Sequence, residues 1–234
     1  MGTDMDRCLI TGASRGIGRA VAVKLAGSGY QLLLHGRDRK ALEQTAALVA
    51  EVGGQAQLIT ADLASEKELA ALIDAVGNEP LKLLVNNAGV ASVKPFEEIS
   101  SDDWLRTLAI NITAPFLLTQ KLVPIMPEGA SIVNLLSVAA RTGFPNWSSY
   151  CMSKFALDGL MQSIREELRP RKIRVINVYP SATNTEMWNG VEGEWPAERM
   201  ISPEEVAEAV HYAISRPADV LVENISVGNI SGTL

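Results

Sequence analysis

Cysteine is scarce in this chain of 234 residues, and two copies, Cys8 and Cys151, are too few for a disulfide framework. We therefore expect a reducing, cytoplasmic location. Basic residues are outnumbered as well, 21 against 27 acidic ones, and the net charge of -6 argues against a nucleic-acid-binding surface.

The two histidines, His35 and His211, lie far apart and predict no metal site. No apolar run approaches the roughly 20 residues of a membrane span, so we expect no membrane partner. Residues 1–6 lack the basic-then-apolar pattern of a secretory signal, and we interpret them as a leader or a disordered end.

Short β-rich runs alternate with helical stretches along the whole chain. The predicted strands cover residues 7–10, 31–35, 55–60, 81–86, 130–137, 173–179 and 220–226. The predicted helices cover residues 16–28, 38–52, 66–76, 102–122, 149–168 and 203–215, and Pro115 should bend or divide the fourth. Such alternation is typical of a parallel sheet with helices on both faces. We therefore predict a single α/β domain over residues 1–234, doubly wound in the Rossmann manner around a mainly seven-stranded parallel sheet.

A glycine-rich turn, Thr-Gly-Ala-Ser-Arg-Gly-Ile-Gly at residues 11–18, connects the first strand to the first helix. Glycine permits the φ angles of a tight turn and lets a diphosphate approach the backbone. The helix that follows presents free N–H groups and a positive dipole end to such an anion. A turn that binds nothing is the plainer reading, but its place after the first strand of a βαβ unit favours a dinucleotide.

The TGxxxGxG spacing of this turn resembles the short-chain dehydrogenase/reductase family, and further motifs of that family follow in order. They are Asp62 after the third strand, Asn-Asn-Ala-Gly at 86–89, Asn111, Ser137, the Tyr150-x-x-x-Lys154 pair, Pro180 and Thr185. The resemblance covers about residues 7–226, nearly the whole chain. It implies a nicotinamide-dependent oxidoreductase acting on a small-molecule carbonyl or alcohol.

The resemblance also implies which residues contact the cofactor. They are Gly12, Ser14, Arg15, Gly16, Ile17, Gly18, Arg37, Asp62, Leu63, Asn87, Ala88, Gly89, Tyr150, Lys154, Pro180, Thr183 and Thr185. No carboxylate stands at the tip of the second strand, where one would accept from a ribose 2′-hydroxyl and favour NAD. Arg37 stands there instead, and Arg15 lies in the glycine-rich turn, so the two guanidiniums favour the 2′-phosphate of NADP(H). The alternatives are that both arginines are solvated surface charges and that Asp62 caps the next helix.

The predicted catalytic group consists of Asn111, Ser137, Tyr150 and Lys154. Tyr150 and Lys154 are four residues apart and share one helix face, so we expect the ammonium to favour the phenolate. In the family, such a tyrosine exchanges the proton while hydride moves between nicotinamide C4 and the substrate carbon; the serine orients the substrate oxygen, and the asparagine supports a water chain to the lysine. Each residue alone has an ordinary structural explanation. The alternative function is a catalytically silent NADP(H)-binding sensor or regulatory protein.

The substrate and its surroundings are less determined by the sequence. Ser181 follows Pro180 where the family usually has glycine, and residues 187–200 should form the substrate lid. Six side chains are candidates for an apolar substrate pocket, with simple packing as the alternative: Val138, Phe144, Trp147, Met187, Trp188 and Trp195. Two predicted helices, 102–122 and 149–168, are more apolar than one sheet face requires, and their pairing in the family implies a homodimer or homotetramer. The particular carbonyl or alcohol and the physiological direction are left open.

Overall fold

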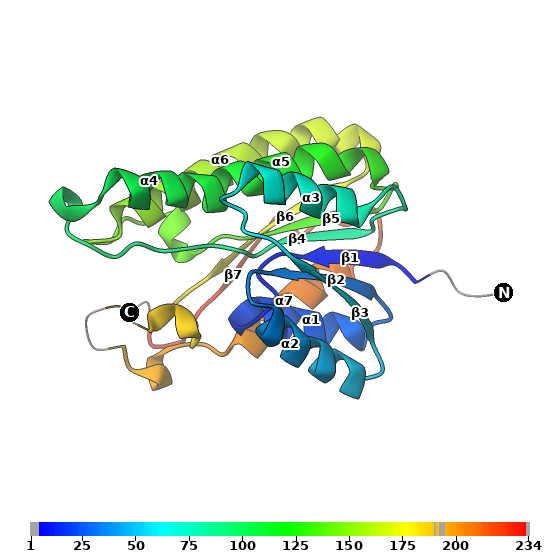
Figure 1. Cartoon of the computed structure of the whole chain (residues 1–234), viewed down its shortest axis with the longest axis horizontal. Helices are drawn as coiled ribbons and strands as arrows, with labels where there is room; N and C mark the ends of the chain where they lie inside the picture. Colours follow the sequence, from blue (N-terminus) through cyan, green and yellow to red (C-terminus); the bar gives the residue numbers. More distant parts are fainter. Residues whose placement is uncertain (1–4, 190, 192–194, 233–234) are drawn as a thin grey trace.

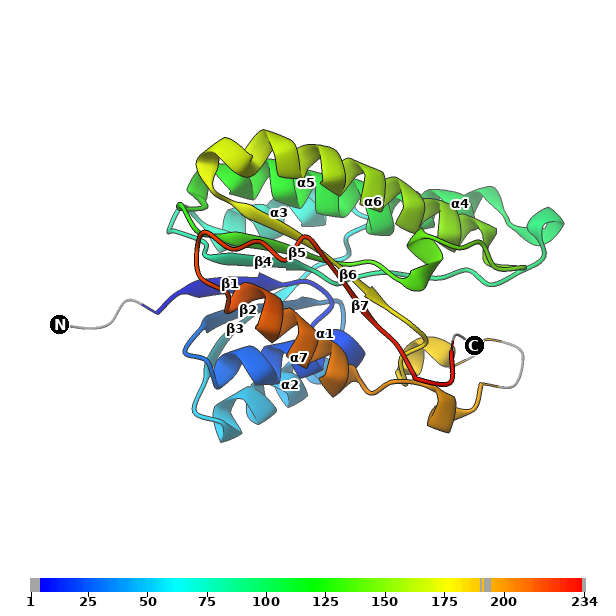
Figure 2. The same ribbon diagram turned by 180° about the vertical axis from the view of Figure 1, so that it is seen from behind.

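A seven-stranded sheet, parallel throughout, forms the centre of the molecule, with helices on both faces (Figures 1 and 2). The computed structural model describes residues 5–189, 191 and 195–232. The strands lie in the order β3-β2-β1-β4-β5-β6-β7. Successive strands are therefore added toward one edge of the sheet from β1 to β3 and toward the other edge from β4 onward, and this strand order reverses between β1 and β4. Ligands of such sheets bind outside the carboxyl ends of the strands at that reversal. The Rossmann-type, doubly wound fold predicted from the sequence is confirmed.

The elements follow the predicted alternation of strand and helix. The strands are β1 Arg7–Ile10, β2 Gln31–Gly36, β3 Gln55–Thr60, β4 Leu83–Asn86, β5 Ser131–Leu135, β6 Arg174–Pro180 and β7 Asn224–Val227. The main helices are α1 Gly16–Ala26, α2 Arg39–Glu51, α3 Glu66–Val76, α4 Ser101–Leu108, α5 Ala114–Leu122, α6 Ser148–Leu168 and α7 Pro203–Ile214. The last strand begins later than predicted, because Leu221 and Val222 pack against the core without pairing in the sheet.

Each face of the sheet carries its own hydrophobic core. Helices α3, α4, α5 and α6 cover one face, and α1, α2 and α7 cover the other (Figure 1). The central strands β4 and β5 are buried at every residue, as their continuous apolar sequences indicate. Helical caps are local and follow from the sequence: Asp38 caps α2, Ser65 caps α3 and Ser202 caps α7.

Pro115 divides the predicted helix 102–122 into α4 and α5. A π-helical turn, Ala109–Thr113, separates the two. Proline lacks the N–H that would bond the carbonyl four residues earlier, and a wider turn accommodates that loss. By length and composition, the stretch Ser101–Ile125 could cross a membrane. Its inner residues Ile110, Ala114 and Leu118 pack against the sheet, as expected of a core helix.

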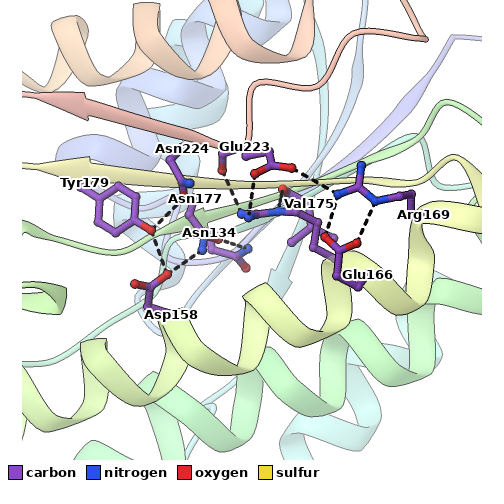
Figure 3. A network of polar contacts seen from close by, with 10 residues as sticks. Asn134, Asp158, Glu166, Arg169, Val175, Asn177, Tyr179, Glu223 and Asn224 are labelled. Carbon is purple, nitrogen blue, oxygen red and sulfur yellow. Dashed lines mark hydrogen bonds and ion pairs between the residues drawn. The ribbon is translucent and has the colours of Figure 1, made fainter.

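A ladder of asparagines crosses four adjacent strands; its first three members are buried, and the fourth is exposed at the start of β7. Asn86, Asn134, Asn177 and Asn224 are paired in register from β4 to β7. Asn86 Nδ2 donates to Asn134 Oδ1 at 2.9 Å, and Asn134 Nδ2 donates to Asn177 Oδ1 at 3.0 Å. Asn177 Nδ2 then donates to Asp158 of α6 at 3.0 Å (Figure 3). The Tyr179 hydroxyl lies within hydrogen-bonding distance of Asp158 Oδ1, at 2.8 Å, and of Asn224 Oδ1, at 2.9 Å. Tyr179 thus connects the network to β7.

Candidate active site

A cleft of about 570 Å³ opens at the carboxyl ends of the strands, at the reversal between β1 and β4. This is the volume range of small-molecule sites. The structure brings nearly all the sequence-predicted site residues to its walls. Those lining it are Gly12, Ser14, Arg15, Gly16, Ile17, Arg37, Asp62, Leu63, Asn87, Ala88, Gly89, Ser137, Tyr150, Lys154, Pro180, Thr183 and Thr185. The two that do not line it are Gly18 and Asn111, which lie buried behind the wall.

The glycine-rich turn has the geometry of a phosphate cradle. Gly12 and Gly16 have backbone φ angles of +66° and +54°, which residues other than glycine rarely adopt. A Cβ on Gly18 would lie 2.2 Å from the Gly12 carbonyl oxygen, so this glycine is needed for packing of the helix against the turn. No side chain caps the first turn of α1 among the described residues, and Gly16 and Ile17 of that turn line the cleft.

His35 fixes the turn against the neighbouring strands, a role that the sequence did not reveal. Its side chain is buried, with Nδ1 accepting from the Gly12 N–H at 3.4 Å and Nε2 lying 3.1 Å from the Ala61 carbonyl oxygen. Burial lowers the pKa of His35, which keeps the ring neutral and able to accept. The only sequence signal was its place at the end of β2, directly before Gly36 and Arg37.

Arg15 and Arg37 stand at the same end of the cleft, and both are exposed. Neither forms a salt bridge within residues 5–189, 191 and 195–232, so both guanidiniums are available to an anion. Asp62 follows β3 nearby and pairs with Arg106 at 3.4 Å. Burial opposes ionisation of Asp62, but the Ala64 N–H and Arg106 outweigh it and lower the pKa of the carboxyl. Because Ser65 caps α3, Asp62 is not the cap of that helix.

The Asn-Asn-Ala-Gly turn after β4 is held by the first strand. Asn87 Nδ2 donates to the carbonyls of Thr11 and Gly12 at 2.8 and 3.0 Å. The Thr11 hydroxyl accepts from the backbone N–H groups of Asn87 and Ala88, each at 3.0 Å. The side chains therefore stabilise the cleft floor, and the backbone of Ala88 and Gly89 lines it.

Tyr150 and Lys154 lie one helical turn apart on α6, both almost fully buried. Lys154 Nζ lies 5.5 Å from the centroid of the Tyr150 ring and donates to the Leu135 carbonyl at 2.8 Å. The sequence led us to expect that the ammonium would lower the pKa of Tyr150. Burial instead raises the pKa of Tyr150 to about 12, although a hydrogen bond with Ser137 opposes that rise. Burial also lowers the pKa of Lys154 to about 8. At neutral pH, Tyr150 therefore keeps its proton and is placed to donate it.

Asn111 lies in the π-helical turn behind Lys154. Its Oδ1 accepts from the Val90 N–H at 2.9 Å, while Nδ2 donates to the Val90 carbonyl and to the Ser153 hydroxyl, each at 2.9 Å. A Cβ on Gly89 would lie 3.5 Å from Asn111 Oδ1 and 3.8 Å from Lys154 Nζ. Asn111 therefore joins the loop after β4 to helix α6 at the level of the lysine.

The wall after β6 contributes Pro180, Ser181, Thr183 and Thr185. The Ser181 hydroxyl is buried and has no hydrogen-bond partner within the described part of the chain. The six pocket candidates named from the sequence also line the cleft, and two of them, Phe144 and Trp147, pack with Tyr150. The predicted lid 187–200 stays a prediction; residues 190 and 192–194 of it, like residues 1–4 of the leader, lie outside the described residues.

The cleft suits a dinucleotide in the chemistry of its donors. It offers a glycine cradle, an uncapped helix start and two arginines that form no salt bridge with the described residues. Its walls also hold Tyr150, Lys154 and the buried Ser181 hydroxyl, which has no hydrogen-bond partner among the described residues. The first set are partners for phosphates and the second for a polar ring. No cluster of metal-ligating side chains occurs among the residues that the structure describes.

Comparison with known proteins gives one consistent family. Residues 6–194 match the model of the short chain dehydrogenase family. The chain is 34% identical to a sepiapterin reductase of Chlorobaculum tepidum, over 97% of both chains. It is 33% identical to a 3-oxoacyl-(acyl-carrier-protein) reductase of Aquifex aeolicus, over 93% of both. Among solved structures, an angucycline C-6 ketoreductase with bound NADP superposes with a TM-score of 0.86 at 29% identity, covering 97% of this chain and 96% of that one.

Proposed function

The chain belongs to the short-chain dehydrogenase family, and on that premise we propose that it is an NADP(H)-dependent oxidoreductase that interconverts a carbonyl and an alcohol. Tyr150 would exchange the proton. The observation that carries this proposal is the position of Tyr150, Ser137 and Lys154 on one wall of the cleft that begins at the glycine-rich turn. The same cleft thus has groups for the cofactor phosphates and for the reacting oxygen.

The preference for NADP(H) rests on Arg15 and Arg37. Both line the cleft, and neither forms a salt bridge within the described residues. A guanidinium can form two parallel hydrogen bonds with a phosphate. Two of the similar solved structures, the angucycline ketoreductase and a Burkholderia cenocepacia short chain dehydrogenase, contain NADP, which supports the assignment.

Bound NADPH would supply a hydride to the carbonyl carbon of the substrate. Ser137 would donate a hydrogen bond to the carbonyl oxygen and orient it. Tyr150, which is protonated at neutral pH because of its raised pKa, would deliver a proton to the same oxygen. Lys154 would hold the nicotinamide ribose, and Asn111 would fix the backbone beside the lysine. In the oxidative direction, Tyr150 would accept the proton.

The test is Tyr150→Phe. This variant should bind NADPH like the wild type in a fluorescence titration and yet lose turnover by at least about 100-fold, the usual contribution of general acid catalysis. Substrates would be found with a panel of ketones, followed by NADPH absorbance. Near-normal turnover by the variant would refute the role of Tyr150. NADPH binding by the wild type without reduction of any ketone, or oxidation of any alcohol, would refute the enzymatic function.

We also propose that the chain forms a homo-oligomer through α4, α5 and α6. Four large apolar side chains on these helices are exposed, among them Leu105 at 60% and Phe155 at 47%; the others are Trp104 and Phe116. Contiguous exposed apolar residues mark interaction surfaces. The family pairs the corresponding helices, which agrees with a second copy as the partner.

A further inference from the structure

Three of the four tryptophans of the chain gather at the Tyr150 end of the cleft. The Trp147 ring centroid lies 5.5 Å from that of Tyr150 and 5.6 Å from that of Trp188. Trp195 lies 4.5 Å from Trp188 and 6.3 Å from Trp147. Trp147 precedes α6, whereas Trp188 and Trp195 belong to the segment after β6, so their convergence beside Tyr150 depends on the fold and not on one local motif. We name Trp147, Trp188 and Trp195 the tryptophan wall.

Two of these indoles have their polar edge tied to the backbone. Trp188 Nε1 donates to the Thr183 carbonyl at 2.8 Å, and Trp195 Nε1 donates to the Val191 carbonyl at 3.2 Å. Their N–H groups are thus already satisfied, and what they offer a ligand is ring surface. Centroid separations of about 4.5–7 Å are those of rings in mutual contact. A ligand therefore lies against the tryptophan wall and is not enclosed between its rings.

Within the described part of the chain, the uncharged side chains Val138, Ala139, Phe144, Pro145 and Met187 line the same cleft as the tryptophan wall. Lys154 is the charged group that lies beside Tyr150 there. Glu186 also lines the cleft, but its Oε2 lies 3.9 Å from the position of a Cβ on Gly16, so it faces the glycine-rich turn. A substrate carboxylate or phosphate placed at the tryptophan wall would lose its hydration, and within the described residues the cation beside it is Lys154, which the proposed function assigns to the cofactor ribose.

We propose that the substrate is a flat, uncharged ketone, or the corresponding alcohol, whose carbonyl carbon is bonded directly to an aromatic or fused ring. This proposal rests on the proposed function and names its substrate class. The ring would stack on the tryptophan wall while the carbonyl oxygen reaches Tyr150 and Ser137. Because the rings of Trp147 and Tyr150 are in edge contact, a group stacked on the wall lies beside the ring that carries the reacting hydroxyl. In reduction, the hydride brings two electrons to the carbonyl carbon, the C=O π bond opens, and Tyr150 gives its proton to the oxygen.

The test compares acetophenone with cyclohexyl methyl ketone, two methyl ketones with the same ring size that differ in flatness and in conjugation of the carbonyl. Conjugation is the same for every variant, so the change of the ratio on substitution reports the tryptophan wall. The wild type should have a kcat/KM at least about 10-fold higher for acetophenone. Trp147→Leu and Trp188→Leu should each reduce that ratio by about 2- to 10-fold, the contribution of one aromatic pair. Trp147→Phe should restore part of the ratio. The control is Tyr212→Leu, which removes an exposed aromatic side chain of α7 outside the cleft and outside the proposed interface and should leave the ratio unchanged.

A binding measurement separates substrate choice from chemistry. Tyr150→Phe loaded with NADPH should bind acetophenone more tightly than cyclohexyl methyl ketone by calorimetry, although it turns over neither. Equal kcat/KM for the two ketones, with ratios unmoved in the tryptophan variants, would overturn the substrate class and leave the proposed function intact. Preference for a ketone that carries a trimethylammonium group would overturn it as well, because the wall would then bind cations. Failure to bind NADPH would instead refute the proposed function.

Discussion

Replacing Lys154 with methionine should make the protein without cofactor more stable at pH 7. The Lys154 side chain is 4% exposed, and burial lowers its pKa from 10.5 to about 8. Since one pKa unit corresponds to about 1.4 kcal/mol, holding the charged form in this position costs on the order of 3 kcal/mol. Methionine keeps an unbranched side chain without the charge. It loses the hydrogen bond to the Leu135 carbonyl, worth about 1 kcal/mol, so the net gain should be about 2 kcal/mol.

The pH dependence of that difference tests its cause. The folded-state pKa of Lys154 lies below the unfolded value, so between about pH 8 and 10.5 the unfolded chain binds more protons. The stability of the wild type relative to the methionine variant should therefore rise with pH in this window, by about 2 kcal/mol between pH 7 and 9.5. Burial raises the pKa of the Cys8 thiol, which lowers stability over the same window but does so equally in both proteins. Tyr150, with its raised pKa, weakens folding only above about pH 10, and it does so in both proteins.

The assay is urea unfolding of both proteins without cofactor at pH 7 and pH 9.5, followed by circular dichroism. Lys67→Met, which changes an exposed lysine of α3, is the matched control and should stay within about 0.5 kcal/mol of the wild type at both pH values. A methionine variant of Lys154 that is no more stable at pH 7, or an advantage that does not shrink by pH 9.5, would refute the reasoning. The Lys154→Met variant should also lose activity, since the proposed function requires the ammonium that is costly to bury at this position.

Three further predictions concern the cofactor, the ladder and the oligomer. Arg37→Asp should weaken NADPH binding far more than NADH binding in a fluorescence titration, and equal losses would refute the phosphate assignment. Asn134→Leu should destabilise the protein by roughly 2–5 kcal/mol in urea unfolding, because it leaves Asn86 and Asn177 each with an unpaired buried group; a loss under about 1 kcal/mol would contradict this. Leu105→Glu should reduce the mass seen by light scattering at about 10 µM, whereas a wild type that is already monomeric would refute the proposed interface.

The sequence predicted correctly those features that depend on residues close together in the chain. The order of strands and helices, the glycine-rich turn and the placement of Tyr150 one turn before Lys154 all depend on residues within a few positions of each other. The direction of the pKa shift of Tyr150 was predicted wrongly, because spacing shows the neighbouring ammonium but not the burial of both groups. The role of His35 was missed for a similar reason, since its partners Gly12 and Ala61 come from other segments.

The asparagine ladder was invisible in the sequence, because it exists only once four strands are paired in register, yet it explains how the site is held. Each of its first three members lies one to three residues before a residue that lines the cleft. Asn86 is followed by Asn87, Asn134 lies three residues before Ser137, and Asn177 lies three residues before Pro180. Apolar residues at these positions would pack as well but would tolerate small shifts between neighbouring strands, whereas hydrogen bonds of 2.9 and 3.0 Å fix the strands to one another. A site that must align a hydroxyl, a tyrosine and a cofactor needs supports of that precision. Loosening the ladder should therefore disturb turnover before it unfolds the chain, because Ser137 and Pro180 depend on the strand ends that it connects.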